Sequence, residues 1–119
     1  MSSKKKIMAA LAFAVLAGAA GAQYVGPSGL RPTSVAEVLK SGKDDQQVLL
    51  QGVLLKKVGH EKYEFSDGTG TIRVEIDDKI FPREPIDEKT RVEIVGEIER
   101  DFMTSPEIDV DAIRHLPAP

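Results

Sequence analysis

The sequence predicts a mainly β protein, in which a five-stranded closed barrel follows one short N-terminal α-helix. Three observations lead to this fold class. The hydrophobic pattern changes from helical spacing to a period of two at Gln46. After that point, five segments alternate apolar and polar residues. Two of these segments contain a glycine, Gly52 or Gly96, as expected where a strand bends at a barrel corner.

The helix is predicted between an N-terminal cap at Thr33 or Ser34 and a stop at Gly42. Ser34 and Glu37 have the spacing of a capping box. One side of the helix carries an apolar stripe, formed by Val35, Val38 and Leu39. A helix of about two turns does not persist alone in water, so we expect this one to cover the barrel.

The first strand is predicted over residues 48–55, and the second strand includes Tyr63 and Phe65, whose side chains share one face. The segment Asp67–Gly70 is predicted as a tight hairpin connection, because its glycines accept positive φ angles. The third strand, residues 71–77, is the most regular, with Ile72, Val74 and Ile76 facing one way.

The fourth and fifth strands are predicted over residues 91–99 and 107–111. The connection 78–88 contains two prolines and is expected to place Phe81 and Ile86 against the core. An irregularity is expected near Ala112, where the alternation breaks. A sheet this small leaves an apolar face and two open edges unless it closes, so we predict a barrel of the OB type.

Composition limits the classes of function. A chain of 119 residues supports one domain. The absence of cysteine excludes disulfides, thiolate metal sites and a cysteine nucleophile.

The first 22 residues are predicted to be a secretory signal peptide. Three lysines at positions 4–6 precede an uncharged apolar run, and Ala20-Gly21-Ala22 has the pattern of a cleavage site. The apolar run is shorter than the roughly 20 residues that span a bilayer, although an uncleaved anchor stays an alternative. We therefore expect a periplasmic protein without a membrane span after cleavage, with a flexible lead-in over residues 23–32 and the OB-fold domain over residues 33–119.

Several segments resemble the bacterial periplasmic OB-fold family (BOF). The segment from Tyr63 to Val74 resembles the hairpin between strands 2 and 3 of OB folds. The wider similarity includes Gly26-Pro27, Val48–Gly52, Val74–Asp77, Val92–Glu97 and Glu107–Val110. The resemblance implies an exported, non-enzymatic protein linked to tolerance of oxidative, metal, acid or cationic-peptide stress. The chain departs from the family in having no tryptophan, and Phe81 and Phe102 stand near the usual tryptophan positions.

Acidic residues are the candidate binding groups. In an OB barrel, the surface of strands 2 and 3 and the loop between strands 4 and 5 flank the ligand groove. Candidate ligand-binding residues near those places are Asp67, Arg73, Glu75, Asp77, Glu99 and Asp101. They would form an anionic groove for a cationic peptide or a small ligand, with Arg73 as a positive group for a ligand carboxylate. Alternating acids on a strand are also typical of a solvated outer face, which stays an alternative.

Other functions are not expected. Removal of residues 1–22 would change the formal net charge from −3 to −6, which repels nucleic-acid phosphates. Tyr63 and Phe65 are expected in the core and not on a base-stacking surface. His60 and His115 are expected at the surface, and the sequence has no Ser/His/Asp spacing, nucleotide loop or EF-hand pattern. We predict no catalytic residue, metal or cofactor.

The sequence therefore predicts a periplasmic, non-enzymatic binding module in envelope stress tolerance, with a cationic or small ligand in an acidic groove. The alternative is an interaction module, in which a strand edge or the N-terminal helix docks on an envelope protein or a cell-wall component.

Overall fold

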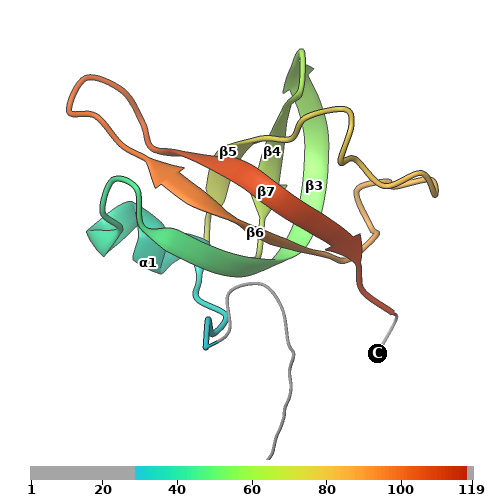
Figure 1. Cartoon of the computed structure of the whole chain (residues 1–119), viewed down its shortest axis with the longest axis horizontal. Coiled ribbons are helices and arrows are strands. Elements are labelled where there is room, and N and C mark those ends of the chain that lie inside the picture. The colour runs from blue at the N-terminus through green and yellow to red at the C-terminus, as the bar shows by residue number, and fades with distance from the viewer. Residues whose placement is uncertain (1–28, 118–119) are drawn as a thin grey trace, which may run out of the picture. The chain divides into compact units, whose positions relative to one another are not determined.

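A computed structural model of the chain describes residues 29–117, so the predicted signal peptide and the lead-in up to residue 28 lie outside the described residues. A compact unit begins at Arg31 and contains one helix and five strands (Figure 1). In chain order these are α1 (Val35–Ser41), β3 (Gln47–Gly59), β4 (Lys62–Ser66), β5 (Thr71–Glu75), β6 (Val92–Glu99) and β7 (Glu107–His115). Within residues 29–117, no helix has the length and apolar content needed to span a membrane.

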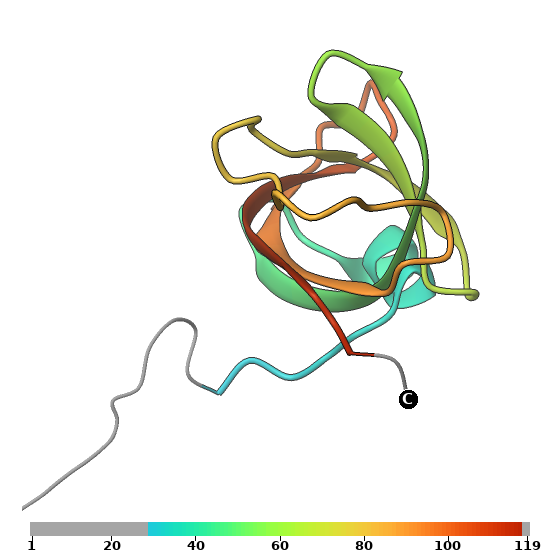
Figure 2. The ribbon, with the colours of Figure 1, turned by 90° about the vertical axis from the view of Figure 1, so that its right-hand side faces the viewer.

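The five strands form a closed barrel in the order β3-β4-β5-β7-β6, and β6 pairs again with β3. Every pairing is antiparallel except that of β5 with β7, which is parallel. Figure 2 shows the strands wrapped around a common interior. The predicted five-stranded closed OB barrel with a preceding helix is confirmed. In Figure 1, α1 and the β6–β7 loop lie at the left of the barrel, and the connection 76–91 lies at the right.

The barrel interior is filled by the inward side chains of all five strands and by two valines of α1. Phe65 is the largest fully buried side chain and lies on β4. The other buried apolar residues are Val35, Val38, Val48, Leu50, Leu54, Ile72, Val74, Ile76, Val92, Ile94, Ile98, Ile108 and Val110. Phe81 and Ile86 pack against this core from the connection 76–91, as predicted. Tyr63 is half-buried and stacks on Phe81, with 5.2 Å between the ring centroids.

Glycine is required at the two predicted bends because neighbouring strands approach closely there. A Cβ atom added to Gly52 would collide with the carbonyl oxygen of Ser66 on β4. A Cβ atom added to Gly96 would collide with the carbonyl oxygen of Asp109 on β7. Both positions are therefore closed to larger residues unless the backbone moves.

Two strands extend further than the hydrophobic pattern predicts. Beyond residue 54, the rest of β3 pairs with β4 but is exposed on both faces, so its alternation is invisible in the sequence. β7 continues to His115 after a bulge, because Val95 pairs with Ala112 while Gly96 pairs with Val110. The extra residue is Asp111, which places the bulge next to the expected irregularity.

The chain before α1 is tied to the barrel. Pro32 forms a parallel bridge with Leu49 of β3, and the Thr33 amide donates a hydrogen bond of 2.9 Å to the Leu49 carbonyl. These contacts fix the point from which the helix begins.

Candidate functional site

The N-terminus of α1 is capped by the hairpin between β4 and β5. The Val35 amide donates to Oδ2 of Asp67 at 2.9 Å, and the Ala36 amide donates to Oγ1 of Thr69 at 3.0 Å. The Glu37 amide donates to Oγ of Ser34 at 3.0 Å, as the capping pattern predicts. The amides at the start of the helix, which have no acceptor inside it, are thus satisfied by side chains.

Asp67 therefore has a structural role. Its partial burial alone would raise the pKa of the carboxyl group, but the hydrogen bonds from Thr69 and Val35 together hold that pKa below its ordinary value. The carboxylate also accepts the amide of Thr69 at 2.9 Å, which closes the hairpin turn. The ionised form of Asp67 joins this turn to the helix.

Two rows of cross-strand partners lie on the outer face of β4, β5, β7 and β6, in that order. The first row is Glu64, Arg73, Glu107 and Glu99, and the second row is Lys62, Glu75, Asp109 and Glu97. On β4 and β5 each row pairs opposite charges, whereas on β7 and β6 both rows contain carboxylates only. We use the name acidic ladder for four of these acids, which lie on the neighbouring strands β5, β7 and β6: Glu75, Glu107, Asp109 and Glu99.

The two basic residues of these rows lie toward one side of the acidic ladder. Nζ of Lys62 is 2.8 Å from Oε1 of Glu107 and 3.9 Å from Oε1 of Glu75. The guanidinium group of Arg73 is 4.0 Å from Oε2 of Glu107. Among residues 29–117, no ion pair involves Glu99 or Asp109. The acidic ladder therefore keeps an excess of negative charge on β6 and β7.

The pKa of Glu99 reports this excess. Desolvation by the surrounding protein raises the pKa above its ordinary value, and the carboxylates of Asp109, Glu75 and Glu107 raise it further. Lys62 opposes the shift without cancelling it. The ionised form of Glu99 is thus disfavoured by its acidic neighbours.

Two open hollows border the acidic ladder, and residues of the segment 104–107 line both of them. The first, which we call the helix-side groove, has a volume of about 660 Å³ and is lined by Leu39, Glu64, Thr71, Ile72, Arg73, Thr104, Ser105, Pro106 and Glu107. The second, which we call the acidic hollow, has a volume of about 430 Å³ and is lined by Asp44, Glu99, Arg100, Asp101, Thr104, Ser105 and Glu107. Volumes of this size are typical of ligand sites.

Arg100 connects the lining of the acidic hollow to α1. Its guanidinium group donates to the carbonyls of Val38 and Leu39, at 2.9 and 3.1 Å, and so caps the C-terminal turn of α1. Its amide donates to Oδ1 of Asp44 at 2.8 Å. One residue thus joins the helix, the turn before β3 and the start of the β6–β7 loop.

Comparison with known proteins identifies the family. A model of the bacterial OB fold (BOF) protein family matches residues 16–115. The chain belongs to the BOF family.

Two curated BOF relatives are similar over most of the chain. The calcium-regulated OB-fold protein CarO of Pseudomonas aeruginosa is 41% identical over 101 residues, which cover 85% of this chain and 84% of CarO. Protein YgiW of Escherichia coli is 39% identical over 83 residues, which cover 70% of this chain and 63% of YgiW. The solved structure of E. coli YgiW superimposes with a TM-score of 0.69 at 40% identity, covering 81% of this chain and all of that one.

More distant structures share only the fold. The telomere capping protein Ten1 of Schizosaccharomyces pombe superimposes with a TM-score of 0.56 at 18% identity, over 73% of this chain and 81% of Ten1. At that identity the likeness supports the OB barrel and no particular ligand.

In this BOF protein, the predicted site residues divide into two groups. Arg73 lines the helix-side groove, Glu75 belongs to the acidic ladder, and Glu99 and Asp101 line the acidic hollow. Asp67 caps α1, and Asp77 accepts the amide of Lys79 at 2.8 Å in a turn after β5. The remaining predicted residues thus meet on one surface, which Asp67 and Asp77 do not line.

Several charged residues of this surface were not predicted, among them Asp109 of the acidic ladder. Glu107 takes part in both hollows and in the acidic ladder, Lys62 is its closest cation, and Asp44 lines the acidic hollow. Glu107 begins an alternating acidic strand, which was a visible signal. The sequence carries no such signal for Lys62 and Asp44, because their places on this surface depend on strands that are far away in the sequence.

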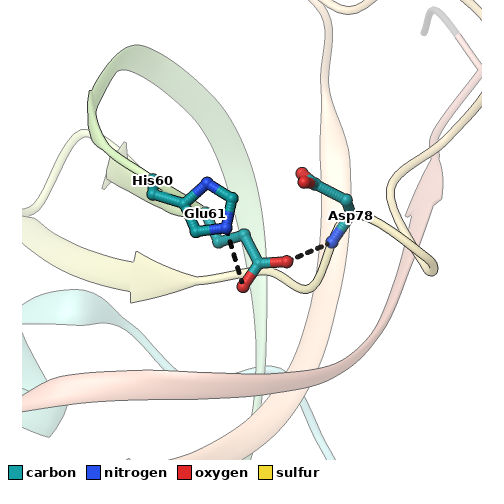
Figure 3. Close-up of side chains that lie close together, drawn as sticks. All are labelled: His60, Glu61 and Asp78. Carbon is teal, nitrogen blue, oxygen red and sulfur yellow. Dashed lines mark hydrogen bonds and ion pairs between the residues drawn. The ribbon is translucent and has the colours of Figure 1, made fainter.

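A separate cluster of potential metal ligands lies at the β3–β4 turn (Figure 3). The relevant atoms of His60, Glu61 and Asp78 lie within 4.8 Å of one another. Nε2 of His60 is 3.8 Å from Oε1 of Glu61, and Oε2 of Glu61 accepts the amide of Asp78 at 2.9 Å. The side chain of His60 is 81% exposed, as predicted. Glu61 thus has a structural role here, because it joins the turn to the end of β5.

We predict that Glu99→Gln stabilises the protein at about pH 7. Because the folded-state pKa of Glu99 is raised, its ionisation favours unfolding, and this cost appears as the pH rises from its ordinary pKa through the raised value. Solvent screening limits the expected gain to about 0.5 kcal/mol. Urea unfolding at about pH 7 and about pH 4 measures it, and the gain should disappear at the lower pH and shrink in salt.

Glu84→Gln is the matched control, because Glu84 is exposed on the connection 76–91 at the other end of the barrel. A variant at Glu99 that is no more stable than this control at neutral pH would show that the acidic ladder carries no electrostatic cost.

Proposed function

We propose that the protein is a non-enzymatic binding module of the bacterial envelope that takes a cationic ligand on the acidic ladder. The observation that carries this proposal is the convergence of Glu75, Glu99, Glu107 and Asp109 beside two hollows, with too few cations to balance them. Such a surface attracts positive charge and costs stability while it is empty, and a bound cation would offset that cost.

We propose export to the periplasm, with residues 1–22 as the cleaved signal, and a role in tolerance of envelope stress. The composition of residues 1–22 supports export. Membership of the BOF family supports the stress role.

A binding role is favoured over docking through a strand edge or α1. The barrel closes on itself, so each of the strands β3 to β7 pairs with two others, and unpaired edge is confined to stretches such as residues 53–59 of β3, which pair with β4 alone. The apolar residues Val35 and Val38 of α1 are buried against the barrel, where they are not available to a partner. A non-enzymatic role is supported by His60 and His115, which are both exposed and line none of the hollows described above.

Titration of the purified protein with spermidine, followed by amide chemical shifts, tests the proposed function. We expect shifts on β5, β6 and β7 around the acidic ladder, and an affinity that falls as the salt concentration rises. The double variant Glu99→Gln/Glu107→Gln should bind spermidine about fivefold more weakly. Because Glu107→Gln also removes the ion pair with Lys62, urea unfolding of the double variant is measured alongside, and a fold that stays intact at the titration temperature shows that unfolding does not explain the loss.

The matched control is Glu84→Gln/Glu88→Gln, which removes the same charge from the connection 76–91 and should leave the affinity unchanged. Shifts scattered evenly over the surface, or an equal loss of affinity in both double variants, would contradict a localised site.

A further inference from the structure

The β6–β7 loop presents two large apolar side chains to solvent. Phe102 is 96% exposed and Met103 is 77% exposed. Leu39 of α1, which lines the helix-side groove below the loop, is also partly exposed at 39%. Apolar side chains of this size are unfavourable in water, and exposed aromatic and methionine side chains are typical anchors of binding surfaces.

The loop that carries these side chains is held in shape. Oδ1 of Asp101 accepts the amide of Met103 at 2.8 Å and the amide of Thr104 at 3.0 Å. The same oxygen also accepts the hydroxyl of Thr104. Arg100, the first residue of the loop, is hydrogen-bonded to α1 and to Asp44. A partner that contacts Phe102 and Met103 therefore does not have to order the loop first, which lowers the entropy cost of binding.

The surroundings of the loop are acidic. The acidic hollow next to the loop is lined by four carboxylates, those of Asp44, Glu99, Asp101 and Glu107. Its one basic residue, Arg100, directs its guanidinium group to the carbonyls of α1. Charge complementarity thus calls for a partner with positive charge next to a large apolar group.

We propose that the ligand of this surface is a polypeptide segment in which basic side chains flank a large apolar one. This inference rests on the proposed function and specifies its ligand. The apolar side chain contacts Phe102 and Met103, and the basic side chains reach the acidic hollow and the acidic ladder. An apolar loop tip of this kind also suits insertion into a membrane, but the surrounding carboxylates repel anionic lipid headgroups, so a peptide is favoured.

Three probes test this inference by isothermal titration of the purified protein. The first is a short peptide amide that alternates lysine with leucine or phenylalanine, the second has serine at each apolar position, and the third is spermidine. We expect Phe102→Ser/Met103→Ser to weaken binding of the first peptide about tenfold and to leave the other two affinities unchanged. Thermal unfolding of this variant should match that of the unchanged protein, because both side chains are exposed.

Leu55→Ser is the matched control, since Leu55 is an exposed apolar residue of β3 outside both hollows. If the loop variant binds the apolar peptide as well as the control does, while spermidine still binds, the inference is overturned and the proposed function stands. If none of the probes binds, both are overturned.

Vesicles of phosphatidylglycerol test the membrane alternative. Vesicle binding that Phe102→Ser/Met103→Ser abolishes, together with an unchanged affinity for the apolar peptide, would overturn the inference in favour of membrane insertion. Absence of vesicle binding, together with the tenfold loss for the peptide, supports it.

Discussion

Gly52→Ala is expected to lower the free energy of unfolding by about 3 kcal/mol, because the added methyl group has no room. Its Cβ atom would collide with the carbonyl oxygen of Ser66 and would lie 2.9 Å from Cζ of Phe65. The first contact is with the backbone of β4, and the second is with the largest fully buried side chain of the core. Relief therefore requires the β3–β4 pairing to shift. Urea unfolding followed by circular dichroism measures the change.

Gly59→Ala provides the comparison on the same strand. A Cβ atom there would lie 3.6 Å from Cβ of Lys62, which is ordinary contact, so the expected change is below about 0.5 kcal/mol. Equal destabilisation by the two substitutions would show that the cost comes from β3 in general and not from the barrel corner at Gly52.

Arg100→Met is expected to cost about 2 kcal/mol of unfolding free energy, although it keeps most of the apolar stem of the side chain. The variant loses the guanidinium hydrogen bonds to the carbonyls of Val38 and Leu39 at the end of α1. The Val38 carbonyl keeps the amide of Gly42 as a donor, so the cost falls mainly on the Leu39 carbonyl. The β6–β7 loop loses its attachment to the helix at the same time. We therefore expect weaker binding of spermidine as well, measured by the same titration that tests the acidic ladder.

Arg83→Met controls for the loss of positive charge. Arg83 is exposed on the connection 76–91, and its side chain makes no hydrogen bond or ion pair within the described part of the chain. An affinity for spermidine that rises in both variants alike would indicate that Arg100 acts only through its charge and not by holding the loop.

Local patterns were enough to predict the fold. The capping residue Ser34, the glycines at the bends and the alternation of each strand are properties of short segments, and each was found where expected. The far end of β3 was missed because both of its faces are exposed, so no apolar period marks it.

The candidate site was predicted less well, because it depends on which strands are neighbours. Glu75 and Glu99 were predicted from their places on outer faces, but the parallel pairing that brings β7 beside β5 has no local signature. For the same reason the sequence did not reveal that Glu107 lies beside Arg73 and Lys62. The helix-capping role of Asp67 was not predicted, because its bond to α1 joins residues that are 32 positions apart.

The bond between Asp67 and the start of α1 also bears on the order in which the fold can form. The helix is synthesised first, but the turn that satisfies its amides emerges only after 32 further residues. The pairing of β3 with β6 comes later still, since Gln51 is 42 positions from Glu93, although β3 pairs with β4 close by in the sequence. The barrel therefore cannot close until the last strand, β7, has been synthesised.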